Sequence, residues 1–449
     1  MSNHKKLIAN QALAFAAQLM PAIIGVLSFM LLVRVTSQEA LGQFVIYMAA
    51  VVLFEMVKSG GLQSALVMRV ASCTHEQQRE VSGSAYWLSG LFSVSVSLIL
   101  LILFLTGVFS TNPAIHIFCG LYAILGVITV PINIAEAEAV AHQDLKFLFW
   151  LRVTQSASTL LIALYVWLTH AGLAGLATMH VIINGVLLLV ILLLKKTNPL
   201  NILHKTKTEV LELYHLIKYT LATLATTNLL KTADTFLIGS MMGPAAVARY
   251  AIPLKLTELF EIPLRSLSTT AFPTLAANHN KKDYPKFREN FVQYLSWAYL
   301  IYIPALTLAL ILAPVVILII GGQKYMDTVM IFRVFVLFGL FLPANRMTGI
   351  SLDALQLPAR NFRKVLIMAI INIVGDVIAI QVTHQLEWVA AISVLNAAVG
   401  AVIGWVMLEK TGKLPGKDLG KEIVQYCLHF VRLFLSKLKL VQPPATTHG

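Results

Sequence analysis

The pattern of hydrophobic and polar positions predicts about twelve membrane-spanning helices. Apolar runs of roughly 20 residues, each long enough to cross about 30 Å of hydrocarbon, recur along the whole chain. The predicted spans cover 9–33, 42–67, 82–107, 114–138, 147–168, 173–194, 216–241, 246–276, 291–318, 328–350, 363–382 and 388–408. Short polar connections separate them, so the sequence predicts an all-α polytopic membrane protein.

Prolines interrupt two of these spans. Pro253, Pro263 and Pro273 recur along the span predicted at 246–276, and Pro343 falls within the span at 328–350. A proline inside a helix removes a backbone hydrogen bond and kinks the helix. We therefore expect both spans to bend where they line a cavity.

Basic residues in the connections predict the orientation. The connections on one side carry Lys5, Lys6, Arg69, Arg79, Lys146, Lys195, Lys196, Lys205, Lys207, Lys281, Lys282, Lys286, Arg288, Arg360, Arg363 and Lys364. The opposite side has little beyond Arg34, Arg249 and Lys324. Since cytoplasmic loops are enriched in Lys and Arg, both termini are expected in the cytoplasm, which requires an even number of spans.

The two halves of the sequence resemble each other. Residues 41–56 align with 247–262, which matches Phe54–Glu55 to Phe260–Glu261, and Thr169–His170 corresponds to Thr383–His384. An even number of spans in each repeat preserves its sidedness. We therefore expect two parallel six-helix lobes. The predicted parts are an N-terminal lobe at 1–194, a cytoplasmic interlobe linker at 195–215, a C-terminal lobe at 216–410, and a basic cytoplasmic tail at 411–449 with an amphipathic helix over 418–441.

Composition excludes several classes of protein. With 58% hydrophobic and 12% charged residues, the chain is too apolar for a soluble protein. Its net charge of +13 resides in short loops rather than in an aromatic-laced patch, so no nucleic-acid partner is expected. Cys73, Cys119 and Cys427 are scattered, which argues against a disulfide or metal framework. The sequence lacks a P-loop and a nucleophile elbow, so neither an enzyme nor a cofactor is expected.

Charged residues inside the apolar spans are the candidate functional residues, because charges at bilayer depth are costly. They form pairs three or four residues apart, within reach on one helix face: Glu55 with Lys58, Lys231 with Asp234, Lys255 with Glu258, and Glu261 with Arg265. One interpretation is that these pairs neutralise each other and hold helices together. The other is that the cations hold a diphosphate in an interlobe cavity, while an acid takes up H⁺ or Na⁺. The concentration of charge in the second, seventh and eighth spans favours the second interpretation.

Further charged residues are less distinctive. Arg346 follows a proline and fits either a cavity or a position where the side chain extends to the interface. Arg152 and Asp376 are cavity residues or interlobe partners. Glu136 and Glu138 end the fourth span and are expected to be solvated.

Three passages carry a family resemblance. They are LLVRVTSQEALGQFVIYMAAVVLFEMVKSGG at 31–61, KTADTFLIGSMMGPAAVARYAIPLKLTELFEIPLRSLSTTAFPTL at 231–275, and GGQKYMDTVMIFRVFVLFGLFLPANRMTGISLDALQLPAR at 321–360. Together with the twelve-span pattern, they resemble the polysaccharide-transport (Wzx-type O-antigen or repeat-unit flippase) branch of the multidrug/oligosaccharidyl-lipid/polysaccharide (MOP) exporter superfamily. The resemblance implies a MATE/Wzx-like fold and the export of undecaprenyl-diphosphate-linked oligosaccharide, for lipopolysaccharide O-antigen, capsule or exopolysaccharide. The cargo would move by alternating access from the cytoplasmic to the outer leaflet of a bacterial inner membrane.

The resemblance also implies roles for individual residues. Those expected to contact the substrate are Lys58, Lys231, Lys255, Arg265 and Arg346. Those expected to couple transport to H⁺ or Na⁺ are Asp234, Glu258, Glu261 and Glu55. The expected partners are the lipid-linked oligosaccharide, membrane lipids, and a polysaccharide polymerase with its chain-length regulator.

Two alternatives remain within the same superfamily. Cation-coupled multidrug exporters typically carry an acidic residue in the first span, where this chain has none. Lipid II flippases usually have two further spans and a cationic first span. A membrane scaffold without transport is a third possibility, but it would not explain the cations within the spans.

Overall fold

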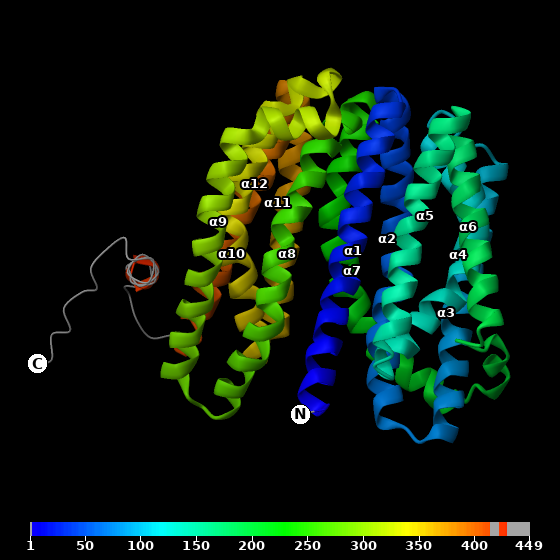
Figure 1. Ribbon diagram of the computed structural model, residues 1–449, viewed down its shortest axis with the longest axis horizontal. Coiled ribbons are helices and arrows are strands. Elements are labelled where there is room, and N and C mark those ends of the chain that lie inside the picture. Colours follow the sequence, from blue (N-terminus) through cyan, green and yellow to red (C-terminus); the bar gives the residue numbers. More distant parts are fainter. Residues whose placement is uncertain (1, 414–421, 429–449) are drawn as a thin grey trace, which may run out of the picture. The chain divides into compact units, whose positions relative to one another are not determined.

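The computed structural model describes residues 2–413 and 422–428, and the regular structure of this part of the chain is helical throughout (Figure 1). Twelve long α-helices and two short 3-10 helices follow one another. They are α1 (Ser2–Val35), α2 (Gln38–Ser72), α3 (His75–Leu105), α4 (Pro113–Ala141), α5 (Leu145–Thr169), α6 (Leu173–Leu193), η1 (Pro199–His204), α7 (Lys207–Met241), α8 (Pro244–Asn280), α9 (Tyr284–Gly321), η2 (Gln323–Thr328), α10 (Val329–Ala354), α11 (Pro358–Thr383) and α12 (Leu386–Glu409).

Most of these helices can cross a membrane. Within the residues that the structure describes, nine helical segments are long and apolar enough for a span, and α1 contributes a shorter apolar part at Leu19–Val35. The charged helices α7 and α8 are not among the nine but are 35 and 37 residues long. The protein is therefore a multi-pass, all-α membrane protein, as the hydropathy pattern predicted.

Equivalent helix ends support the internal repeat. α5 and α11 both end on a histidine with left-handed backbone, His170 with φ 52° and His384 with φ 51°. In both turns the preceding threonine hydroxyl accepts a hydrogen bond from the backbone amide two residues later, at 3.3 Å for Thr169 and 3.2 Å for Thr383. The two sequence matches at these positions therefore correspond to the same local structure.

By packing, the chain divides into two compact units, 1–251 and 252–449, called here the N-terminal and C-terminal units. The boundary between the units falls within α8. The lobes predicted at 1–194 and 216–410 stay a prediction. In the N-terminal unit α2 packs against α4 and α7, α3 against α4, and α1 against α5. Leu62 and Leu66 of α2, Val81 of α3, Val130 of α4 and Leu213 of α7 share one buried cluster.

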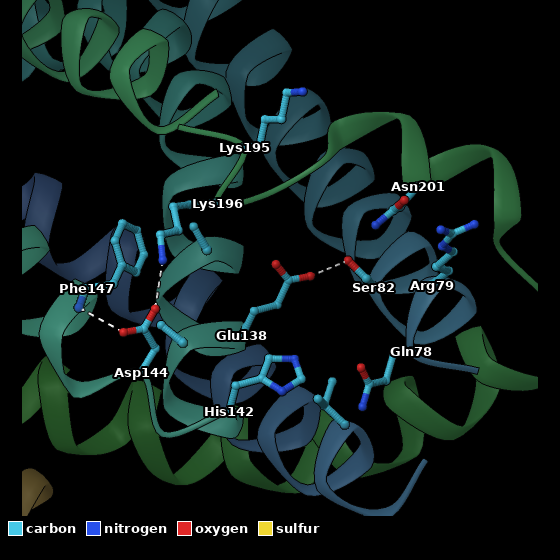
Figure 2. Close-up of a pocket in the computed structure, with 13 residues that line it drawn as sticks. Gln78, Arg79, Ser82, Glu138, His142, Asp144, Phe147, Lys195, Lys196 and Asn201 are labelled. Atoms are coloured by element: carbon cyan, nitrogen blue, oxygen red, sulfur yellow. Dashed lines mark hydrogen bonds and ion pairs between the residues drawn. The ribbon is translucent and has the colours of Figure 1, made fainter. Parts of the chain in front are cut away.

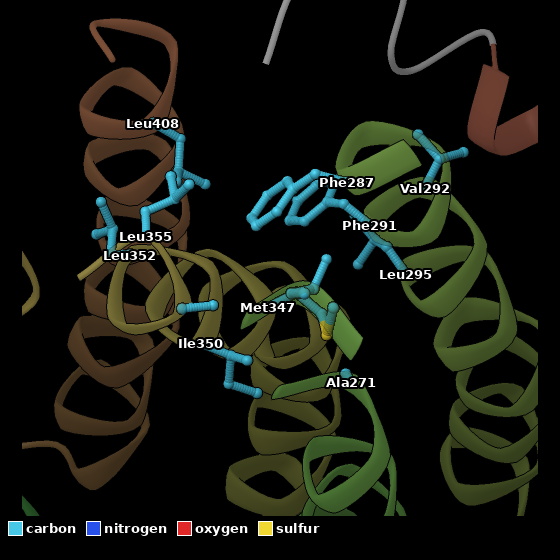
Figure 3. Close-up of a cluster of buried hydrophobic side chains, with 12 residues drawn as sticks. Ala271, Phe287, Phe291, Val292, Leu295, Met347, Ile350, Leu352, Leu355 and Leu408 are labelled. Atoms are coloured by element: carbon cyan, nitrogen blue, oxygen red, sulfur yellow. The ribbon is translucent and has the colours of Figure 1, made fainter. Parts of the chain in front are cut away.

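In the C-terminal unit α10 packs against α9 and α12, and α11 packs against α12. Phe287 and Phe291 of α9 lie at the centre of a buried cluster with Met347 of α10 and Leu408 of α12 (Figure 3). Large side chains from three helices thus fill one core, which fixes α10 between its neighbours.

The tail approaches the same unit. Ile423 packs against this cluster, and Glu422 lies 2.7 Å from the Arg288 guanidinium of α9. Val424 and Leu428 are exposed, so the helical segment 422–428 has one face on the protein and another that is free. The rest of the amphipathic helix predicted over 418–441 lies outside the described residues.

Candidate functional site

Glu55 and Lys58 form a buried ion pair one turn apart on α2. The Lys58 ammonium lies 2.6 Å from Glu55 Oε1, and the lysine is only 6% exposed. Its Nζ also donates to the Gly126 carbonyl oxygen at 3.0 Å and to the Thr129 hydroxyl, both on α4. Because an ammonium has three donors, these contacts occupy Lys58 completely.

Other donors hold the Glu55 carboxylate. The Tyr122 hydroxyl donates to Oε1 at 2.9 Å and the Thr129 hydroxyl at 2.8 Å, while Asn133 Nδ2 donates to Oε2 at 3.0 Å. All three donors belong to α4. The network therefore fixes the Glu55 carboxylate against α4 and ties α2 to it.

Glu55 also faces a cavity inside the N-terminal unit. The cavity has a volume of about 270 Å³ and lies between α2, α4, α5 and α6. Its polar lining residues are Glu55, Ser59, Thr129, Asn133, Gln155, Ser158, Thr159, His180 and Asn184. His180 Nδ1 lies 3.3 Å from the Tyr47 hydroxyl. A cavity of this size with polar walls admits water, so a proton or a small cation could reach the carboxylate.

The α7 pair is divided between the interior and the surface. Asp234 is buried, and the Tyr250 hydroxyl at the start of α8 donates to its Oδ2 at 2.6 Å. Lys231, one turn earlier on α7, is exposed. Of the two, only Asp234 is held within the packed helices.

Two ion pairs lie along α8 in the C-terminal unit. Lys255 lies 2.7 Å from Glu258, and Arg265 lies 3.0 Å from Glu261. The four side chains are between 31% and 57% exposed, unlike Lys58. Exposed pairs of this kind contribute only about 0–1 kcal/mol to stability. Charged groups exposed along a membrane helix require polar surroundings, so this surface is the strongest candidate for contact with a polar cargo.

Arg346 on α10 lies next to the same surface. Its Nε donates to the Ser268 hydroxyl of α8 at 3.2 Å, one turn beyond Arg265. The side chain is exposed. The structure therefore brings Arg346 to the α8 helix that carries four of the predicted site residues.

Asp376, predicted as a cavity residue or interlobe partner, lies in a buried polar cluster on α11 and α12, whose other members were not predicted from the sequence. Asp376 is fully buried and accepts a hydrogen bond from Asn372 Nδ2 at 2.8 Å, and Asn396 Nδ2 donates to Asn372 Oδ1 at 3.1 Å. Carboxylate and amide oxygens of this kind can hold a proton or a hard cation. The signal in the sequence was the four-residue spacing of Asn372 and Asp376, together with an asparagine in the apolar α12.

The structure corrects three expectations. Lys364, placed in a cytoplasmic loop, is buried in α11, where its Nζ donates to the Asn345 backbone and side-chain oxygens of α10, both at 2.9 Å. Glu136, expected to be solvated, pairs with Arg152 of α5 at 2.9 Å. Glu138, also expected to be solvated, accepts a hydrogen bond from the Ser82 hydroxyl of α3 at 2.5 Å. Each of these side chains contacts a neighbouring helix, and the hydropathy of the sequence does not show which helices are neighbours.

A protein-family model described as "Polysaccharide biosynthesis protein" matches residues 31–330, well over half of the chain. The chain belongs to this family. The family match confirms the predicted link of this chain to polysaccharide biosynthesis. No curated protein sequence gives a significant match.

Several solved structures of other proteins have the same fold as this chain. An inward-facing multidrug resistance MATE family transporter of the MOP superfamily is similar with a TM-score of 0.73 and 14% identity, over 89% of this chain and 98% of the other. The lipid II flippase MurJ in an inward closed conformation has a TM-score of 0.67 and 16% identity, over 95% and 93%. A MOP superfamily transporter from Pyrococcus furiosus has a TM-score of 0.63 and 15% identity, over 90% and 96%. At such low identities the likeness establishes the MOP fold alone.

Proposed function

We propose that this polysaccharide biosynthesis protein is a flippase of the bacterial inner membrane. Its cargo would be an undecaprenyl-diphosphate-linked oligosaccharide repeat unit of O-antigen, capsule or exopolysaccharide. The flippase moves this cargo from the cytoplasmic to the outer leaflet by alternating access, coupled to H⁺ or Na⁺. The family match and the MOP fold support transport in polysaccharide biosynthesis. The observation that carries the proposal is the row of exposed ion pairs along α8.

The α8 cations suit a diphosphate. Lys255 and Arg265 each have one carboxylate partner in the same helix, and their side chains are 33% and 56% exposed. A diphosphate carries more charge than one carboxylate and can displace it through charge-assisted hydrogen bonds. Arg346, beside Ser268, extends the same basic surface. Lys231, in the N-terminal unit, stays a candidate for substrate contact on sequence grounds alone. Lys58 has no free donor, so its role in the proposal becomes the positioning of Glu55.

Glu55 is the acid best placed for coupling. It combines a buried cation partner with access to a polar cavity, whereas Glu258 and Glu261 lie on exposed ion pairs. Protonation of Glu55 would remove the charge that holds Lys58 and weaken the hydrogen bonds from α4, which changes the packing of α2 on α4. Asp234 and the Asp376 cluster are further groups through which an ion could act.

The proposal includes no covalent chemistry. The solved structures with this fold are described as transporters and a flippase. The residues considered above bind, pair and position rather than form a nucleophile with a base. We expect the protein to deliver its cargo to a polysaccharide polymerase and chain-length regulator on the outer side.

Two other cargoes have specific support. A multidrug exporter is the second candidate, because a multidrug resistance MATE family transporter has the same fold. The similarity to MurJ keeps lipid II as the third. Neither alternative accounts for a family model of polysaccharide biosynthesis.

Gene deletion separates these functions. In a strain that retains its glycosyltransferases, deletion should remove surface polysaccharide and cause undecaprenyl-linked oligosaccharide to accumulate in the inner membrane. Surface glycan is read on a stained gel and the lipid-linked species by mass spectrometry. Normal glycan with new sensitivity to cationic drugs would contradict the proposal and support the multidrug exporter. Arrested cell-wall synthesis with accumulated lipid II would support the third candidate.

A further inference from the structure

A second cavity lies at the end of the N-terminal unit where basic connections gather (Figure 2). Its volume is about 330 Å³, and residues of α3, α4, the start of α5 and the segment after α6 line it. None of its lining residues belongs to the cavity at Glu55. Because Lys146, Lys195 and Lys196 lie at this end, the positive-inside rule places the cavity at the cytoplasmic surface of the membrane.

The segment after α6 closes this cavity against α3. The Tyr86 hydroxyl lies 2.5 Å from the Thr197 hydroxyl, and the Thr206 amide donates to the Ser84 hydroxyl at 3.4 Å. At Gly83 a Cβ would lie 2.0 Å from the Asn201 carbonyl oxygen, so only glycine permits this close approach. This part of the predicted linker is therefore a packed wall of the cavity.

The walls carry charges of both signs that have no oppositely charged partner among the described residues. Neither Arg79 nor Lys195 forms an ion pair with an acid in the part of the chain that the structure describes. Lys196 is neutralised by Asp144 at 2.8 Å. The Glu138 carboxylate projects into the cavity, where it accepts a hydrogen bond from Ser82 but has no cation partner among the described residues (Figure 2).

We propose that this cavity binds the headgroup of an amine-bearing phospholipid of the phosphoethanolamine type. Arg79 and Lys195 would bind its phosphate, and Glu138 would bind its ammonium group. A purely anionic headgroup satisfies the two cations but places its charge near an unneutralised carboxylate. A zwitterionic headgroup satisfies both signs through charge-assisted hydrogen bonds, and basic pockets on the cytoplasmic side of membrane proteins are established lipid sites.

The outer face of α3 offers a place for the acyl chains. Trp87 and then Leu91, Val94 and Leu98 recur at helical spacing and are all exposed. The Lys205 ammonium lies over the Trp87 ring, an arrangement typical of the membrane interface. This apolar stripe favours a lipid over soluble phosphoethanolamine as the source of the headgroup.

Native mass spectrometry of the full-length protein in detergent tests the proposal. Phosphatidylethanolamine and phosphatidylglycerol with the same acyl chains are titrated in parallel, and soluble phosphoethanolamine serves as a competitor. We expect phosphatidylethanolamine to bind about tenfold more tightly than phosphatidylglycerol. The double variant Arg79→Ala/Lys195→Ala should weaken both lipids about tenfold. Glu138→Gln should remove the preference between them while leaving phosphatidylglycerol bound.

Matched controls remove the same charges outside the cavity. Lys146→Ala and Glu80→Gln lie at the same end of the unit and should leave both affinities unchanged. Thermal unfolding of each variant shows that it is folded. Equal binding of the two lipids by the unaltered protein would overturn the proposal. So would a Lys146→Ala effect as large as that of the double variant, or full displacement of lipid by soluble phosphoethanolamine.

Discussion

The Lys58 ammonium lies 2.6 Å from the Glu55 carboxylate, with the lysine buried and the glutamate at the wall of a polar cavity. The lysine is too buried to contact a ligand, and its removal would lower the stability of the protein. The carboxylate, in contrast, can exchange a proton with water in the cavity. One pair thus joins a structural cation to a candidate coupling acid. The α8 pairs, three and four residues apart, are exposed, so similar spacings along a helix lead to different environments in the two units.

Removal of Lys58 should destabilise the protein. Lys58→Met leaves the Glu55 carboxylate in a buried site without its cation, which costs about 3 kcal/mol. Thermal unfolding in detergent should show a lower Tm for this variant. The double variant Lys58→Met/Glu55→Gln should recover most of the loss, because no uncompensated charge remains. A double variant less stable than Lys58→Met would contradict this account.

Glu55→Gln leaves the buried Lys58 ammonium without its anion, so some loss of protein is expected, but glycan export normalised to protein level should be abolished. The amide keeps the shape of the side chain and its oxygen can still accept one of the hydrogen bonds that Tyr122 and Asn133 donate, but it cannot take up a proton. Surface polysaccharide and membrane protein level are measured in the complemented deletion strain. Glu55→Asp, which retains an ionisable group, should recover part of the export. Full export by Glu55→Gln would remove Glu55 from the coupling mechanism.

Loss of the α8 cations should affect transport much more than stability. Lys255→Ala and Arg265→Ala each remove an exposed pair worth about 0–1 kcal/mol, but should lower export about tenfold or more if they bind the diphosphate. Lys286→Ala is the matched control, because Lys286 forms an exposed pair with Glu289 at 2.9 Å near the start of α9. If all three variants lowered export equally, the effect would come from the loss of any positive charge and not from the α8 surface in particular.

Lys364→Met should loosen the contact between α10 and α11. The methionine fills similar space but removes the Lys364 donor from the partly buried Asn345 side-chain oxygen, at a cost of about 1–3 kcal/mol. Arg363→Met changes an exposed neighbour and should alter the Tm little. Unfolding of both variants in the same detergent gives the comparison. A Tm for Lys364→Met equal to that of the unaltered protein would argue against a structural role for this lysine.

Gly83→Ala should detach the segment after α6 from α3. Its new methyl group would lie 2.0 Å from the Asn201 carbonyl oxygen, so η1 must move. Limited proteolysis should then cut within 199–204 faster than in the unaltered protein. Gly90→Ala on the same helix meets no atom within 4 Å and is the control. Equal rates of cleavage in both variants would show that Gly83 does not hold η1.

Much of the fold could be read from the sequence because the bilayer imposes a length and a polarity on every span. The runs from 42–67 to 388–408 all became helices, although α3, α7 and α9 begin seven to nine residues before their predicted starts. The repeated Thr-His pairs became equivalent helix ends. The three- and four-residue spacings also predicted three ion pairs correctly, since neighbours on a helix face are determined by helical geometry alone.

What the sequence determined by itself was the class of protein, its helices and the local pairing of charges, because these depend on residues near one another in the chain. Only the tertiary structure decided which charges are buried. It enclosed Lys58 with α4, placed Lys364 against Asn345, and buried Asp234 beside Tyr250. The physical reason is that burial and long-range hydrogen bonds depend on which helices pack together, and hydropathy along one helix carries no record of its neighbours.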